Sequence, residues 1–454
     1  MASTQISMTQ AAGTSTKKFT VSMWFKPGAI STNRGLWGCG TGTGDAVSMH
    51  YQTGDTFSLE TWDGSSNPKL QPIRKFRDPT AWYHLVFSID TTNVTADDRL
   101  KIWVNGVRET GPYISNVTIT QDSDIPGWSG SGDTMKIGNR ILDGDAYFDG
   151  ELSHVHVIDG TIYDASTFGE TDSTSGIWKI KTSPTVTYGT NGCFIKMEDR
   201  TNLDLDSSPN AHTMTTAGTL TATYDNPSNN FATMNPLEFM NSTPTWANGN
   251  ATYTQGGTSL YYPASGTMGL TAGKWYWEVQ STNGANNNSL LGIAGDASNT
   301  GNMVGSNNQV LGYTAQQWAY YGNNGNYRTN NGNVAYGSGF YGNVIIGVYL
   351  DLDNNKLYFA SGGTIMESGT GIDITAASST DAGYYVPASN YWGGSDTFQY
   401  NFGNGYLGTT AITSPQDDAG GIGAFKYDPS VGTFDSASKD FRAICTKNIK
   451  AYGG

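Results

Sequence analysis

Two neighbouring strand-like runs constrain the fold of this chain most strongly. The first, 82–90, reads WYHLVFSID, and the second, 100–107, reads LKIWVNGV. In both runs every second residue is apolar, which is the period of a β-strand. The second run ends in Asn105-Gly106, a pair that tolerates positive φ and is the strongest local signal for a β-hairpin. Because the intervening Val86 and Trp103 are also apolar, we expect strands covered on both faces, inside a two-sheet core.

Length and composition extend this prediction to the whole chain. At 454 residues the sequence exceeds one sandwich, which favours two domains of about 200 residues each. It contains 58 Gly, and only 14% of its residues are charged, whereas 12% are aromatic. Aromatic residues favour strands and Gly favours the turns between them. The sequence therefore predicts an all-β protein with two β-sandwich (jelly-roll) domains in tandem.

A stretch rich in Pro, Asn, Ser and Thr marks the domain boundary. Apolar periodicity fades over 206–245, which we interpret as a connector between a domain at 1–205 and a domain at 246–454. The connector carries three apolar side chains that we expect to anchor it on a domain: Phe231, Met234 and Leu237. The first 18 residues are polar, and we expect them to form an edge strand or a subunit contact.

The charge pattern excludes several classes of partner. The net charge is −14, and the 25 Lys and Arg residues are scattered singly, which argues against nucleic-acid binding. No apolar stretch approaches the roughly 18 residues needed to cross a bilayer. The amino terminus shows no basic start followed by an apolar segment, so we expect no signal peptide and no membrane insertion.

Four runs of the first half resemble one known family. They are FTVSMWFKP (19–27), the hairpin pair of 82–107, MKIGNR (135–140) and YFDGELSHVHVIDGTI (147–162). In this order they resemble the laminin-G-like, concanavalin A-like jelly roll. The resemblance implies a β-sandwich from a family in which glycan or protein binding is common.

The second half resembles the SPRY domain. The matching runs are GKWYWEV (273–279), IIGVYLDLDNNKLYF (345–359) and YNFG (400–403), and the second contains a hairpin turn at 353–356. The resemblance implies a second β-sandwich that uses variable loops for binding and has no catalytic residues.

The combination of the two halves resembles virion proteins of tailed bacteriophages. In that group such chains look like tail-fibre, adhesin or surface-decoration components, which bind a host-surface glycan or receptor and other virion proteins. The resemblance implies a virion location and a homo-oligomer, for which we expect a trimer. A purely architectural role on capsid or tail is the alternative.

Aromatic residues among Gly and Asn predict a carbohydrate site in the second half. Aromatic rings stack on sugar C–H faces, and amide side chains bind hydroxyl groups. We expect the site residues to be Trp318, Tyr320, Tyr327, Tyr391 and Trp392. The alternative is that alternate members of each run are core residues of strands.

An acidic loop is a candidate metal site. Asp143, Asp145 and Asp149 lie on a Gly-containing loop, and carboxylate oxygens suit Ca²⁺. Asp-Gly pairs are also ordinary turn chemistry. We expect no other cofactor.

The sequence predicts no enzyme. Laminarinase-like jelly rolls carry E-x-D-x-x-E, and the nearest match is Glu170-Thr171-Asp172 with Ser175 in the sixth position. No nucleophile elbow, phosphate loop or HExxH motif occurs. A polysaccharide depolymerase is therefore the less favoured alternative.

The positions of the histidines and cysteines favour structural roles over metal binding or redox chemistry. His154 and His156 alternate on one strand, which suits a metal pair or a pH switch, but more often marks half-buried, hydrogen-bonded histidines. Cys39, Cys193 and Cys445 are far apart, and we expect buried thiols.

Overall fold

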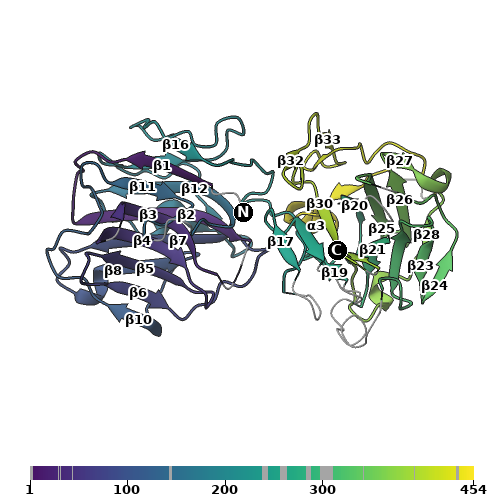
Figure 1. The fold of residues 1–454 in the computed structure, drawn as a ribbon, viewed down its shortest axis with the longest axis horizontal. Helices are drawn as coiled ribbons and strands as arrows, with labels where there is room; N and C mark the ends of the chain where they lie inside the picture. Colours follow the sequence, from purple (N-terminus) through teal and green to yellow (C-terminus); the bar gives the residue numbers. More distant parts are fainter. Residues whose placement is uncertain are drawn as a thin grey trace. The chain divides into compact units, whose positions relative to one another are not determined.

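The chain folds into two compact, almost entirely β units. A computed structural model describes residues 4–28, 30, 32–42, 44–142, 146–237, 244–255, 263–282, 288–296, 310–340, 342–392, 394–435 and 439–453. With 5% helix and 42% strand, it confirms the predicted fold class. The first unit comprises Met1–Ala222 and Asn226–Ser228, and the second comprises Thr223–Asp225 and Asn229–Gly454. In Figure 1 the first unit runs from purple to teal and the second from teal to yellow.

The first unit is a sandwich of two antiparallel sheets (Figure 1). Its eight-stranded sheet has the order β10 (Tyr113–Val117), β6 (Lys69–Pro72), β5 (Phe57–Trp62), β4 (Asp45–Tyr51), β3 (Arg34–Gly42), β11 (Thr134–Ile137), β1 (Gln5–Thr9), β16 (Thr215–Ala217). Its six-stranded sheet has the order β15 (Cys193–Ile195), β12 (Gly150–Asp159), β2 (Lys18–Pro27), β7 (Tyr83–Asp90), β8 (Leu100–Val104), β9 (Val107–Arg108). Apolar side chains from both sheets form one buried core between them.

The predicted hairpin region lies in the six-stranded sheet. β7 pairs with β8 in antiparallel register, so Phe87 opposes Ile102. The Asn-Gly turn has positive φ at Asn105 (47°) and Gly106 (84°), but it joins β8 to the short β9 rather than to β7. Outside the main core, Val86 and Trp103 are buried in a second apolar cluster that includes α1 (Ala165–Phe168). The prediction that these strands are covered on both faces is confirmed.

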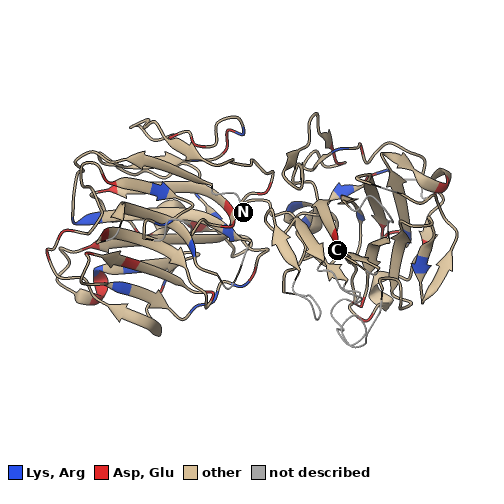
Figure 2. Ribbon diagram, in the orientation of Figure 1, with Lys and Arg blue, Asp and Glu red and all other residues tan. Residues whose placement is uncertain are grey.

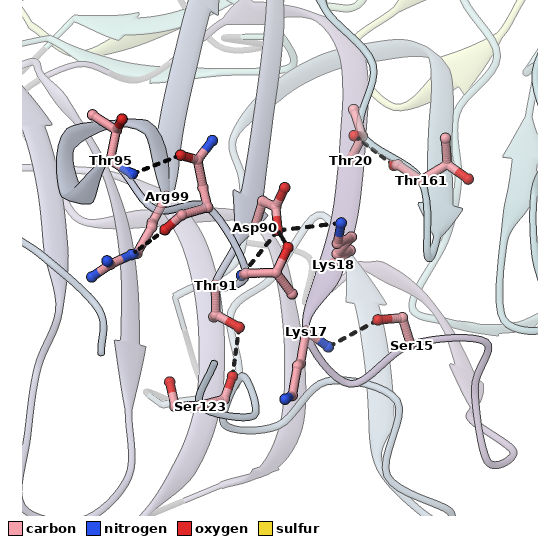
Figure 3. Close-up of polar contacts among 12 residues, drawn as sticks. Ser15, Lys17, Lys18, Thr20, Asp90, Thr91, Thr95, Arg99, Ser123 and Thr161 are labelled. Carbon is pink, nitrogen blue, oxygen red and sulfur yellow. Dashed lines mark hydrogen bonds and ion pairs between the residues drawn. The ribbon is translucent and has the colours of Figure 1, made fainter. Parts of the chain in front are cut away.

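Polar contacts fix the connection that follows β7, as Figure 3 shows. Asp90 accepts a hydrogen bond from the backbone N–H of Thr92 at 3.0 Å and forms an ion pair with Lys18 at 3.6 Å. The hydroxyl of Thr91 donates to the carbonyl of Ser123 at 2.6 Å. These contacts tie the end of β7 to β2 and to the loop that contains Ser123.

The amino-terminal segment corrects one prediction. β1 is not an edge strand, because it lies between β11 and β16 inside the eight-stranded sheet. Ile6 opposes Ile137 on one side and Thr216 on the other, and its side chain is 2% exposed. The outer neighbour comes from the connector, far away in sequence. Local pattern gives no signal for such a partner.

The described part of the predicted connector, 206–237 and 244–245, is ordered but divided between the two units. In the first unit, the buried carboxylate of Asp206 accepts hydrogen bonds from the backbone N–H groups of Phe194 and His212, both at 2.8 Å. In the second unit, Phe231 and Met234 are buried as expected. Leu237 does not act as an anchor, because it is 52% exposed.

The second unit is built around two large sheets, with two small two-stranded sheets beside them, β31 (Tyr406–Leu407) with β32 (Thr410–Ala411) and β33 (Gln416–Asp417) with β34 (Ala424–Phe425). The larger has the order β17 (Thr245–Ala247), β18 (Thr252–Gln255), β30 (Asp396–Asn401), β20 (Lys274–Ser281), β25 (Ile345–Asp351), β26 (Lys356–Ser361), β27 (Thr364–Ile365), with β28 (Ile372–Asp373) beside β26 and β35 (Arg442–Ala443) beside β20. The smaller has the order β19 (Ala264–Ser265), β29 (Val386–Tyr391), β21 (Ser289–Ala294), β22 (Gln317–Tyr321), β23 (Tyr327–Thr329), β24 (Gly332–Val334). The predicted turn at 353–356 joins β25 to β26, with Asn355 at φ 53°.

Candidate functional site

Three of the five predicted carbohydrate-site residues lie in the core. Trp318 and Tyr320 are two residues apart in β22, so both face the other sheet, and they are 5% and 0% exposed. Tyr391 at the end of β29 is 6% exposed and belongs to the same core. Their rings offer no open face to a sugar. For these three the alternative interpretation as core residues of strands is correct.

The other two predicted residues are half-buried and lie on different sides of the sheet. Tyr327 opposes Tyr320 in the ladder between β22 and β23 and packs against the core. Trp392 follows Tyr391, so its side chain lies on the outer face of the smaller sheet, where it packs beside Leu290 and Tyr321. Only Trp392 of the predicted set is therefore placed on an outer surface.

On that outer face, the structure brings Trp392 together with Tyr321 and Arg328. The rings of Tyr321 and Trp392 are stacked, with centroids 5.8 Å apart and planes inclined by 29°. The guanidinium carbon of Arg328 lies 5.1 Å from the centroid of the Trp392 ring, within the range of a cation–π contact. We call Tyr321, Arg328 and Trp392, with Asn288 and Asn323, the outer-face cluster.

Amide groups connect the cluster. The side-chain oxygen of Asn288 accepts hydrogen bonds from the Tyr321 hydroxyl at 2.8 Å and from the Asn323 amide at 2.9 Å. The Asn288 amide donates to the carbonyl of Trp392 at 3.0 Å. Asn288 therefore connects the Tyr321 hydroxyl, the backbone of Trp392 and the exposed amide of Asn323.

Two buried donors lack acceptors, one within the cluster and one on β29. The side chains of Arg328 and Asn390 are 4% and 0% exposed, and neither Arg328 Nε nor Asn390 Nδ2 has a hydrogen-bond partner in the part of the chain that the structure describes. Burial also lowers the pKa of the Arg328 guanidinium. An unpaired buried donor is costly, which sets these two atoms apart from the hydrogen-bonded amides of the cluster.

The cluster has the chemistry of a binding site for a flat, oxygen-rich ligand. Stacked aromatic rings accept an apolar ring face, and amide and guanidinium groups bind hydroxyl or carbonyl oxygens. Tyr321 was absent from the predicted set, although it lies in the same aromatic run as Trp318 and Tyr320. Strand parity is the signal that separates them, because Tyr321 must face away from a core that holds Tyr320.

The predicted metal site is only partly covered by the described residues. Asp143 and Asp145 lie outside them. Asp149 is half-buried, and burial raises the pKa of its carboxyl group. Among the described residues, no group of three or more His, Cys, Asp and Glu side chains has an arrangement that could hold a metal ion.

The near-match to a glycosidase motif forms a surface ion-pair cluster. β13 (Gly169–Thr171) and β14 (Trp178–Ile180) make a short hairpin, in which Lys179 lies 3.3 Å from both Glu170 and Asp172. Hydrogen bonds from Ser175 hold the pKa of Asp172 below its ordinary value. A general acid needs the opposite shift of its pKa, upward from the ordinary value.

The three cysteines, Cys39, Cys193 and Cys445, are buried free thiols, as expected.

Charged residues are interspersed in both units (Figure 2). Blue and red positions are scattered among the tan residues of the drawn chain, consistent with the scattered cations of the sequence. Over the described ranges, no helix has the length and apolar character required to span a membrane.

Comparison with known proteins finds one domain family in each half of the chain. Residues 2–166 match the concanavalin A-like lectin/glucanases superfamily (Laminin_G_3), and residues 274–404 match the SPRY domain. No curated protein matches the chain.

Similar solved structures include the SPRY domain of human HERC1, which is 16% identical, covers 37% of this chain and 96% of its own, and has a TM-score of 0.29. The TRIM65 PSpry domain is 15% identical, covers 37% of this chain and 88% of its own, and has a TM-score of 0.30. The heptameric SAP-like pentraxin of Limulus polyphemus is 20% identical, covers 35% of this chain and 71% of its own, and has a TM-score of 0.26. The two family matches show that the chain contains a laminin-G-type, concanavalin A-like domain followed by a SPRY domain.

Proposed function

We propose that this chain is a binding component of a tailed-bacteriophage virion that attaches to a host-surface glycan or receptor without cleaving it. The outer-face cluster of the SPRY domain is the contact site. The observation that carries this proposal is the stacked pair Tyr321 and Trp392, held by Asn288 beside the guanidinium of Arg328. A pyranose ring stacked against these side chains would have its hydroxyl groups within reach of amide and guanidinium donors.

The virion location rests on the order of motifs in the sequence. A laminin-G-like half, an Asn- and Pro-rich connector and a SPRY half resemble tailed-phage adhesins and decoration proteins. Adhesin contacts are individually weak, and several linked copies raise the avidity by orders of magnitude through effective concentration. We therefore propose a homo-oligomer, with a trimer as the first candidate.

The test is binding of the purified full chain to a panel of bacterial surface polysaccharides and intact cells. We expect saturable binding to a subset, without release of new reducing ends, and antibody labelling of the protein on purified virions. Sustained release of reducing ends would favour the depolymerase. Virion labelling without any cell or glycan binding would favour the architectural role.

A further inference from the structure

Two Ser–His pairs lie in the six-stranded sheet of the first unit: Ser22 with His84, and Ser153 with His154. In the first pair the histidine cannot accept a proton from the serine. Ser22 Oγ lies 2.8 Å from His84 Nε2, and the indole N–H of Trp178 donates to His84 Nδ1 at 3.0 Å. Because Nδ1 accepts this bond, the neutral ring carries its proton on Nε2 and donates to Ser22. Burial lowers the pKa of His84 to about 3, which keeps the ring neutral. His84 therefore cannot take a proton from Ser22.

The second pair has the opposite arrangement. Ser153 Oγ lies 2.8 Å from His154 Nδ1, and the Glu198 carboxylate lies 3.2 Å from His154 Nε2. The carboxylate lies off the direction of a formed hydrogen bond, so its action on Nε2 is electrostatic. It still favours the tautomer with the proton on Nε2, which leaves Nδ1 free to accept the proton of Ser153. Nucleophile, base and carboxylate are thus in the order that activates a serine.

A β-bulge in β12 produces this arrangement. Neighbouring side chains of a regular strand point to opposite faces, which would separate Ser153 from His154. The register between β12 and β2 shifts between Ser153 and His156, and His154 has a φ of 49°. Such a backbone is uncommon for a residue with a Cβ and costs free energy, and bulges often re-aim side chains at functional sites. The bulge turns the His154 ring beside the Ser153 hydroxyl.

We propose that Ser153 is a nucleophile for acyl transfer from small carboxylic esters, with His154 as its base and Glu198 as a positioning residue. Ser153 and His154 are 8% and 7% exposed, while the Glu198 side chain is 49% exposed, so the group lies just below the surface. This limited access restricts the substrate to a compact acyl group. The activity goes beyond the proposed binding function, which needs no reaction at Ser153.

The proposed reaction needs only the ester, Ser153, His154 and water. Ser153 Oγ forms a bond to the ester carbonyl carbon while its proton passes to His154 Nδ1. The C–O bond to the alcohol then breaks, and His154 returns that proton to the leaving alkoxide, which leaves an acyl-serine and a free alcohol. Water, deprotonated by His154, attacks the acyl-serine and releases the carboxylic acid, and the proton returns to Ser153.

A fluorophosphonate probe tests the proposal on the intact chain. Attack by Ser153 forms an O–P bond, expels fluoride and leaves a stable adduct that peptide mass spectrometry locates. We expect labelling at Ser153, loss of labelling in Ser153→Ala, and unchanged labelling in the matched control Ser22→Ala. If the wild-type protein stays unlabelled, or carries its label at another residue, the proposal is wrong. This result does not depend on whether a variant folds.

The pH profile separates a positioning role of Glu198 from a merely structural one. Burial lowers the pKa of His154. The charged and titratable groups that face it are Glu198, which raises that pKa, Lys196, which lowers it, and the neighbouring His156. Removing the carboxylate in Glu198→Gln should slow labelling by about tenfold or more and move the pH midpoint of the labelling rate downward. An unchanged rate and midpoint in the folded variant would exclude this role. Glycan binding is measured separately, so either proposal can fail alone.

Discussion

Tyr321 and Trp392 stack with ring centroids 5.8 Å apart, although Tyr321 ends β22 and Trp392 follows β29, on opposite sides of β21. The pair exists only because three strands of the smaller SPRY sheet come together in this order. Its near neighbours Tyr320 and Tyr391 lie on the opposite face, in the core. The same aromatic segments therefore supply both the interior of the sandwich and its candidate site.

This division predicts opposite effects from two tryptophan substitutions. Trp318→Ala should lower the free energy of unfolding by about 3–5 kcal/mol, because it leaves a cavity in the core. Trp392→Ala should cost much less stability, since the side chain is half-buried at the outer face. Urea unfolding of the two variants measures the difference. Equal losses would mean that Trp392 is a core residue after all.

Sequence alone predicts most of the architecture here, because its signals are local. Alternation over 82–90 and the Asn-Gly pair at Asn105 define strands and turns without any distant partner. The partner of β1 could not be predicted, since β16 is brought there by the fold of the whole unit.

The candidate site was predicted only in part, for a similar reason. Aromatic residues mark the right segments, but strand parity decides whether each faces core or solvent. Trp318 and Tyr321 lie in one short strand and differ only in parity. Trp318 can be assigned to the core and Tyr321 to the outer face only once it is known which side of β22 faces the core.

Deleting residues 1–9 tests the inner position of β1. Because β1 bridges β11 and β16, its loss removes ladder hydrogen bonds on both sides and exposes two strand edges. We expect the first unit to unfold at a lower temperature in calorimetry, while the transition of the second unit stays unchanged. An unaltered first transition would show that β1 contributes little to the sheet.

The buried His84 predicts a pH-dependent stability. Its pKa is lowered to about 3 in the folded chain, and the ordinary value is near 6.5. The folded state therefore binds fewer protons than the unfolded state between these values. The stability from His84 is complete above about pH 6.5 and decreases as the pH falls toward 3, by about 1.4 kcal/mol per pH unit. Denaturant unfolding of His84→Gln should show a shallower decline over this window, and an identical slope would contradict the assignment.

Glu278 should be sensitive to a conservative change. Burial raises the pKa of this carboxyl group, which accepts hydrogen bonds from the backbone of Lys426 and Tyr427 at 2.9 and 2.8 Å and from Asn401 at 2.9 Å. Glu278→Gln places an N–H₂ group against these donors and should cost about 2–3 kcal/mol of unfolding free energy. The surface control Glu170→Gln should change it by less than about 0.5 kcal/mol. Similar values for the two variants would show that the Glu278 network is not specific for a carboxylate.

Binding by a folded Tyr321→Ala, Trp392→Ala double variant tests the central claim most directly. Its affinity for the polysaccharide or cells that the wild-type chain binds is compared with that of Tyr313→Ala, which removes an exposed ring of the same domain. If the outer-face cluster is the binding site, the double variant loses about 2 kcal/mol or more, roughly a 30-fold rise in Kd, while Tyr313→Ala binds as the wild type does. Undiminished binding by the folded double variant would contradict the account.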